Sequence, residues 1–162
     1  MLDKLTEEMI KYYRGDPKRI QHFTKVHAFA ALIGRLEGLH GKELFTLEAA
    51  SIVHDIGIKR AEELYGECGG RLQEELGPPI AREMMHKLGF EHDVIDRTCY
   101  MVSRHHTYTD IDGTDMQILI EADFLVNFYE DGTSHDGILA AYRNIFRTES
   151  GKRICRDMFG IE

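Results

Sequence analysis

The sequence has no cluster of basic residues and no long apolar segment. Its 20 lysine and arginine residues are outnumbered by 28 aspartate and glutamate residues, which gives a formal net charge of −8. Because binding to a nucleic-acid backbone requires a basic surface, we expect no nucleic-acid polymer as a partner. No uncharged run approaches the roughly 18 residues of a membrane-spanning helix, so we expect no membrane partner either.

Cysteine and proline are also scarce. The three cysteines, Cys68, Cys99 and Cys155, are widely spaced and form no Cys-x-x-Cys pair, which is typical of reduced thiols in a cytosolic protein rather than of a disulfide framework. The first helical turns mix acidic and basic residues and so do not resemble an apolar signal region. We therefore expect a cytoplasmic protein. With 162 residues, three prolines and 43% hydrophobic residues, the chain fits one domain, residues 1–162, with a substantial core.

Apolar residues recur at helical spacing in several segments of the chain, which predicts a series of helices. Asp16 is the expected cap of the second helix and Pro17 its first residue, while Thr46 is the expected cap of the third. Gly77-Pro78-Pro79 is expected to separate a short helical segment, 71–76, from the next helix. The expected helices cover 2–13, 18–38, 47–57, 80–88, 91–106, 118–126, 134–147 and 151–159.

The central stretch of the sequence is the apolar segment that ends in His54 and Asp55. Leu47, Ala50 and Val53 form the stripe of a buried helix, and Gly57 is expected to end that helix in the left-handed conformation. An imidazole and a carboxylate buried in such a helix cost free energy unless both have partners. A metal cation satisfies both of them at once.

Three further sites with similar chemistry lie on other apolar segments. They are His22, upstream of the pair, and the doublet His105-His106 and then Asp123, downstream of it. Asp123 lies within an apolar helical run, 118–126, where an unpaired carboxylate is costly. In chain order the residues are thus His, His-Asp, His and Asp, each on a segment that is expected to be a core helix.

This order of residues resembles the HD superfamily of metal-dependent phosphohydrolases. The matching segments are Arg19–Val26 around the first histidine, Ala50–Gly57 around the His-Asp pair, and Glu121–Leu125 around the last aspartate, all within a motif region at about 18–130. The resemblance implies an all-α fold, a single-domain, HD-type helical bundle that holds one or two divalent transition metals. It also implies hydrolysis of phosphate ester or anhydride bonds by a metal-activated water.

The resemblance assigns the first metal to His22, His54, Asp55 and Asp123. Such mixed imidazole and carboxylate ligands suit Mn, Fe, Co, Ni or Zn, and the sequence does not choose among them.

A second metal would be bridged by Asp55 and completed by His106 together with another side chain. Two-metal relatives tend to have a histidine just before a Gly-Pro, but Leu76 stands there in this chain. The candidates to replace that histidine are Glu74, Glu75 and His86, and the alternative is that the second site is vacant. Because adjacent helical residues point in different directions, we expect at most one ring of the His105-His106 doublet to bind metal, with His106 in the family position and His105 free to contact substrate.

The remaining expected site residues contact a small phosphorylated, nucleotide-like substrate. Lys59 is a catalytic candidate together with Asp55 and His106, and the expected substrate contacts are Arg60, Arg104, His105 and Asn127. The loops 65–70 and 107–115 are expected to border the pocket. The sequence leaves a homodimer open. It also leaves open two other functions, a di-iron oxygenase on the same scaffold and a catalytically inert metal-binding sensor or interaction domain.

Overall fold

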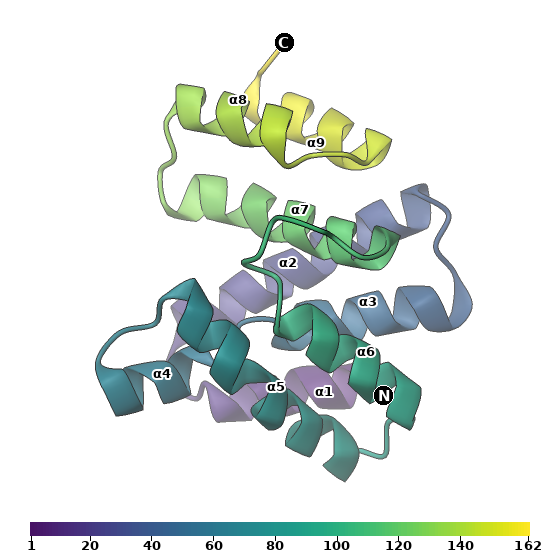
Figure 1. Cartoon of the computed structure of the whole chain (residues 1–162), viewed down its shortest axis with the longest axis vertical. Coiled ribbons are helices and arrows are strands. Elements are labelled where there is room, and N and C mark those ends of the chain that lie inside the picture. The colour runs from purple at the N-terminus through teal and green to yellow at the C-terminus, as the bar shows by residue number, and fades with distance from the viewer.

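Nine α-helices and no β-strands make up the structure, a computed structural model that describes all 162 residues (Figure 1). The expected all-α fold class is confirmed. No helix combines the length and the low polarity needed to cross a membrane. The helices are α1 (Leu2–Tyr12), α2 (Pro17–Leu36), α3 (Gly41–Val53), α4 (Ile58–Tyr65), α5 (Gly70–Lys87), α6 (His92–Val102), α7 (Thr114–Glu130), α8 (His135–Asn144) and α9 (Glu149–Phe159).

Helix α3 lies between two hydrophobic clusters and contributes to both. Leu47 and Ala50 face one cluster, which also includes residues of α2 and α6–α9, whereas Ile52 and Val53 face the other, which also includes residues of α1, α2, α5 and α6. A helix that is enclosed on several sides carries its C-terminal residues into the interior. The His54-Asp55 pair, directly after α3, is therefore buried.

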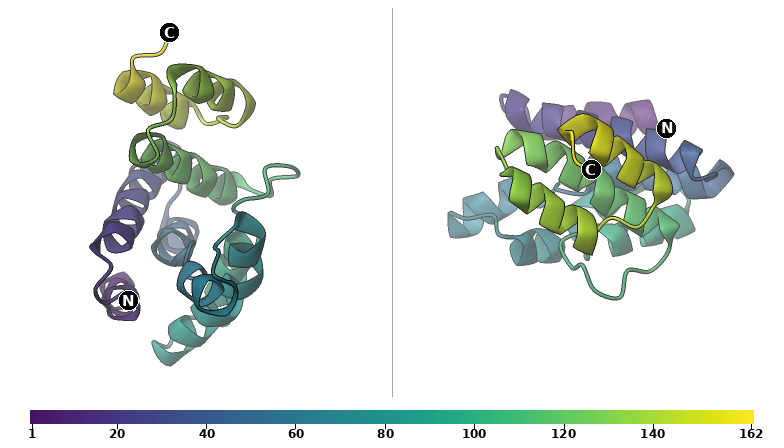
Figure 2. Two further views of the ribbon diagram at one scale, coloured as in Figure 1. Left: turned by 90° about the vertical axis from the view of Figure 1, so that its left-hand side faces the viewer. Right: turned by 90° about the horizontal axis from the view of Figure 1, so that it is seen from above.

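Helix α7 separates the two ends of the molecule. In Figures 1 and 2, α8 and α9 lie on one side of α7, and α1 and α4–α6 lie beyond α2 and α3 on the other side. Glu121 of α7 is fully buried and accepts hydrogen bonds from Gln117 Nε2 and from the main-chain N–H groups of Arg147 and Thr148. These hydrogen bonds thus hold the connection between α8 and α9 against α7.

The start of α2 is confirmed and the expected start of α3 is wrong. Asp16 accepts a hydrogen bond from the Arg19 N–H, and Pro17 is the first residue of α2. Helix α3 begins earlier than expected, at Gly41 after His40. Thr46 lies inside α3, where its hydroxyl donates to the Lys42 carbonyl within the same helix rather than capping it.

The expected break at Gly77-Pro78-Pro79 is also wrong, because α5 continues through both prolines. A Cβ atom on Gly77 would lie 2.7 Å from Val102 Cγ1, so glycine allows α5 to lie directly against α6. Tertiary contact thereby overrides the local preference of proline to end a helix.

Gly57 does not have the expected left-handed conformation, since its φ is −73°. A Cβ atom at this position would lie 2.8 Å from the Gly77 nitrogen and 2.9 Å from the Gln73 carbonyl oxygen. Glycine is needed here for close approach of two backbones rather than for a turn. The hydroxyl of Tyr13 also holds this turn by donating to the Asp55 carbonyl at 3.0 Å.

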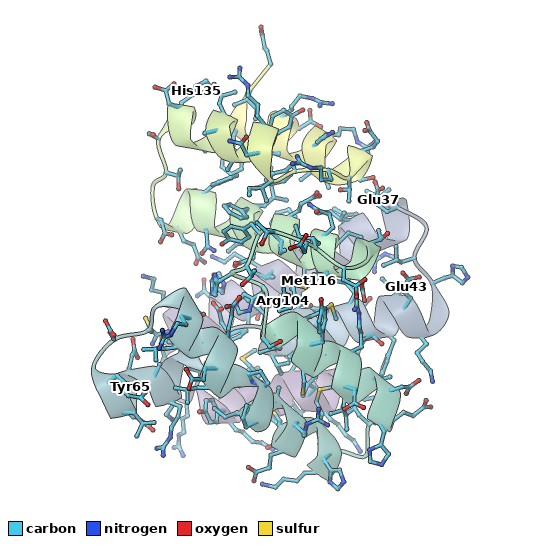
Figure 3. The ribbon with its side chains drawn as sticks, viewed as in Figure 1. Glu37, Glu43, Tyr65, Arg104, Met116 and His135 are labelled. Carbon is cyan, nitrogen blue, oxygen red and sulfur yellow. The ribbon has the colours of Figure 1, made fainter.

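The two loops expected near the pocket are present with shifted ends. Helix α4 extends through Tyr65, at the outer edge of the molecule in Figure 3, and α5 begins at Gly70, so only 66–69 connect them. Helix α6 ends at Val102, and residues 103–113 form the turn and loop that lead to α7.

Candidate metal centre

Four side chains from α2, α7 and the turn after α3 converge in the interior. His22, His54, Asp55 and Asp123 are all buried, and one ligand atom from each lies within 4.8 Å of the others. His22 Nε2 is 3.2 Å from His54 Nε2, 3.3 Å from Asp123 Oδ1 and 3.5 Å from Asp55 Oδ2. The structure thus brings together the four residues that the resemblance assigns to a first metal.

Hydrogen bonds at the far ring nitrogens orient the histidines. His22 Nδ1 is 2.8 Å from Glu130 Oε2, and His54 Nδ1 is 2.9 Å from the Ser51 carbonyl oxygen. Since both partners are acceptors, each Nδ1 carries a proton and donates it. Each ring therefore presents Nε2 to the cluster, as a metal-binding imidazole does.

The charges of the cluster are strongly coupled. Burial would raise the pKa of Asp55, but the neighbouring imidazoles hold it well below its ordinary value, and His22 and His54 also hold the pKa of Asp123 low. Burial lowers the pKa of His22, yet hydrogen bonding to Asp123 and the charge of Asp55 outweigh this and raise it to about 9. Two carboxylates therefore stay ionised in the interior at neutral pH.

This donor set fits a divalent transition metal. Because both Nδ1 atoms carry protons, the Nε2 lone pairs of His22 and His54 would face each other across 3.2 Å if both rings were neutral. A proton on His22 relieves this repulsion in the metal-free protein, and a shared cation relieves it equally while also neutralising the two carboxylates. Two imidazoles and two carboxylates suit Mn, Fe, Co, Ni or Zn.

Both histidines of the doublet reach Asp55, contrary to the expectation that their rings diverge. His105 Nε2 lies 2.8 Å from Asp55 Oδ1 and His106 Nε2 lies 3.6 Å from it, and the three residues form a second cluster. The rings lie side by side because residues 103–106 form a turn after α6, where the 100° rotation of a helix does not apply. His105 is buried with its Nδ1 on the Val102 carbonyl, whereas His106 is partly exposed.

Helix α5 approaches this second cluster with Gln73 and Glu74 rather than with the other expected candidates. Gln73 Oε1 is 2.9 Å from His106 Nε2, and Glu74 accepts hydrogen bonds from the main-chain N–H of His106 and the hydroxyl of Thr107. Glu75 is exposed on another face of α5, as its position one residue further along the helix requires. His86 is exposed near the end of α5, beside His92, and belongs to neither cluster.

The expected cations lie away from the cluster. Lys59 Nζ donates to the Tyr12 carbonyl at 2.8 Å, and Arg60 is exposed beside Glu63. Arg104, labelled in Figure 3, follows α6 and lies over the Tyr100 ring, 6.0 Å from its centroid. None of the three lines a cavity that adjoins the four-residue cluster.

Two open cavities adjoin the cluster from different sides. The first has a volume of about 240 Å³ and includes His22 and Asp55 in its wall, with Lys18 and Arg19 beside them. The second has a volume of about 270 Å³ and includes Asp123 and His106. Asn127 and Asp131 line both cavities, and Asn127 Nδ2 donates to Asp123 Oδ1 at 2.9 Å. The cluster is therefore accessible to a small molecule.

Sequence reasoning missed Glu130 and Gln73. Glu130 follows Asp123 by seven residues and Asn127 by three, so one face of α7 carries all three side chains, and this spacing was a usable signal. No comparable pattern marks Gln73. Its approach to His106 depends on how α5 crosses the turn that follows α6.

The chain is similar to the crystal structure of a predicted HD superfamily hydrolase from an uncultured Thermotogales bacterium. The sequences are 21% identical, and the match covers 98% of this chain and 84% of that chain with a TM-score of 0.70. No protein-family model matches the sequence, and neither does any curated protein. The expected HD-type helical fold is thus confirmed.

Proposed function

We propose that this protein is a metal-dependent phosphohydrolase that cleaves a phosphate ester or anhydride bond in a small, nucleotide-like substrate. The observation that carries the proposal is the convergence of His22, His54, Asp55 and Asp123 between two open cavities. An HD-type fold and a crystal structure described as a predicted HD superfamily hydrolase support it.

The four converging residues would hold one divalent cation. When bound, such a cation activates a water molecule and offsets charge on the phosphoryl group. The chain's own contribution is to orient the ligands, through Glu130 on His22 and Asn127 on Asp123. Exposed Lys18, in the wall of the first cavity, supplies a positive charge at the entrance for an anionic substrate.

His106 would supply the proton that the leaving group needs. Burial lowers its pKa, but the Asp55 carboxylate and other nearby acidic groups raise it above the ordinary value. Its ring lies in the wall of the second cavity, and a leaving oxygen would replace Gln73 Oε1 as the acceptor of its Nε2 proton.

The proposal is tested on protein purified without chelator. Metal content is measured by elemental analysis alongside turnover of a generic phosphomonoester and a generic phosphodiester. Asp55→Asn should lose both metal and turnover, whereas His86→Ala, which removes an exposed histidine outside both clusters, should keep both. The number of metal equivalents also reports whether Asp55, His105 and His106 hold a second ion.

The same samples separate the alternative functions. The second cluster shares Asp55 with the first, which is the arrangement a two-iron oxygenase requires. Two equivalents of iron together with oxygen-dependent turnover would favour the oxygenase over the hydrolase. Bound metal without any turnover would indicate a sensor or interaction domain, and a chain that binds no metal after reconstitution would refute the site itself.

A further inference from the structure

His106 rests against one face of the first turns of α5. Gly70, Gln73 and Glu74 occupy positions i, i+3 and i+4 of this helix, so they share a face. A Cβ atom on Gly70 would lie 2.9 Å from Cβ and Cγ of His106, and Glu74 accepts a hydrogen bond from the main-chain N–H of His106 at 3.0 Å. The ring of His105 lies beside that of His106, with 4.0 Å between their centroids. Both the backbone and the ring of His106 are therefore held in place.

Gln73 provides the hydrogen bond from this face of α5 to the ring itself. It is buried, and both ends of its amide group have partners. Gln73 Nε2 lies 2.7 Å from the main-chain carbonyl oxygen of Cys68, and Gln73 Oε1 lies 2.9 Å from His106 Nε2. A carbonyl oxygen only accepts hydrogen bonds, so the amide nitrogen must face Cys68 and the amide oxygen must face His106.

This orientation of the amide decides which nitrogen of His106 carries hydrogen. An amide oxygen is an acceptor, so His106 Nε2 donates to it and carries a hydrogen whether the ring is neutral or charged. In the neutral ring the lone pair is then on Nδ1. A metal ion requires a nitrogen with a free lone pair, which Nε2 does not offer while it is bonded to Gln73.

We propose that Gln73 is a positioning residue for His106: it fixes the ring in the tautomer with hydrogen on Nε2, which reserves this nitrogen for proton donation and withholds it from a second cation. The role in proton donation rests on the proposed function, whereas the tautomer does not depend on it. In that reaction, the oxygen of water bonds to phosphorus while the bond from phosphorus to the leaving oxygen breaks. The leaving oxygen takes the proton of His106 Nε2, and the proton lost by water restores it.

The test compares two substitutions that keep the length of the Gln73 side chain. Gln73→Met removes both hydrogen bonds, whereas Gln73→Glu loses the bond to Cys68 but keeps an acceptor for His106. The Nε2–H signal of His106 is followed by NMR of the ring nitrogens and is assigned by its absence from His106→Ala. Wild type and Gln73→Glu should protect this hydrogen from exchange with solvent, and Gln73→Met should lose the protection. Gln21→Met, the same change at an exposed position of α2, should behave as wild type.

Thermal unfolding of the same variants separates positioning from a general loss of stability. Gln73→Met and Gln73→Glu should both unfold at a lower temperature than wild type, because each leaves the Cys68 carbonyl without its donor. A merely structural role would therefore impair both variants alike, whereas the positioning role predicts that Gln73→Glu keeps the protected hydrogen.

Turnover and metal content measure the two consequences of the proposal. Gln73→Met should lower kcat for a generic phosphomonoester about tenfold or more with little change in KM, and Gln73→Glu should retain more of kcat. By elemental analysis, wild type should hold one transition-metal equivalent per chain. His106→Ala should hold the same amount, because His106 is not a ligand.

The outcomes distinguish failure of this inference from failure of the proposed function. Two metal equivalents in wild type that fall to one in His106→Ala would overturn the inference, and so would equal protection of the hydrogen in wild type and Gln73→Met. Protection that depends on Gln73 in a protein that hydrolyses no ester would retain the tautomer and refute the hydrolase. Hydrolysis with a kcat that Gln73→Met leaves unchanged would retain the hydrolase and refute the role of Gln73 in proton donation.

Discussion

Glu130 Oε2 accepts a hydrogen bond from Nδ1 of His22 at 2.8 Å, and Lys25 pairs with the other oxygen of the same carboxylate. His54 and His105 instead donate Nδ1–H to main-chain carbonyls. A carboxylate partner makes the imidazole a stronger base than a carbonyl partner does, in addition to holding its orientation. Of these three histidines, His22 is thus the one whose affinity for a cation depends on another side chain.

Replacing Glu130 with glutamine should therefore weaken metal binding. The expected loss is roughly 10- to 100-fold in affinity, measured by competition with a chelator, because the negative charge behind His22 is removed. Glu149→Gln, an exposed substitution at the start of α9, should leave the affinity unchanged. Equal affinities for Glu130→Gln and wild type would show that the contact does not support the metal site.

The stability of the metal-free protein should depend on His22. Its pKa is raised from 6.5 to about 9, so its contribution is fully present below about pH 6.5 and is lost as the pH rises towards 9. In the presence of chelator, the free energy of unfolding should fall by roughly 2 to 3 kcal/mol over this range, measured by denaturant titration at each pH. His22→Gln should flatten this dependence. Metal affinity should rise over the same range, because ligands must be deprotonated, and a wild-type profile as flat as the variant's would contradict the assignment.

Gly57→Ala should destabilise the protein through a backbone clash. The added Cβ would lie 2.8 Å from the Gly77 nitrogen, so α5 or the His-Asp turn must shift. A loss of about 1 to 3 kcal/mol in the free energy of unfolding is expected. Gly69→Ala is the matched control, since its Cβ would meet nothing within 4 Å and its φ of −57° suits alanine. If both variants are equally stable, the close crossing is not needed.

Glu121→Gln should lower stability without loss of metal. The carboxylate accepts hydrogen bonds from three residues in the interior. The amide group of glutamine would place its own N–H donors against at least one of these donors. A cost of about 1 to 3 kcal/mol is expected by thermal or denaturant unfolding. Glu149→Gln should be neutral in this assay as well. Loss of bound metal in folded Glu121→Gln protein would instead connect this residue with the cluster.

Hydrophobic periodicity was sufficient to predict most of the helices, and the resemblance to a known family added the fold class. The stripe of Leu47, Ala50 and Val53 is a local property of the chain, because a helix repeats every 3.6 residues whatever surrounds it. Helix capping is also a local property, so Asp16 and Pro17 predicted the start of α2 correctly. The predictions failed where packing opposed a local preference, at the prolines within α5 and at Gly57, whose conformation depends on the backbone of another helix.

The amino-acid sequence by itself determined the chemistry of the candidate site, because histidine and aspartate in apolar helices are costly unless something satisfies them. Only the tertiary structure decided which atoms meet. It placed both His105 and His106 beside Asp55, brought Glu130 to His22, and left Lys59 on a main-chain carbonyl. These relationships depend on how α2, α5, α6 and α7 cross. The crossing angles are decided by side-chain packing between segments that lie far apart in the chain, and local sequence patterns carry no information on that packing.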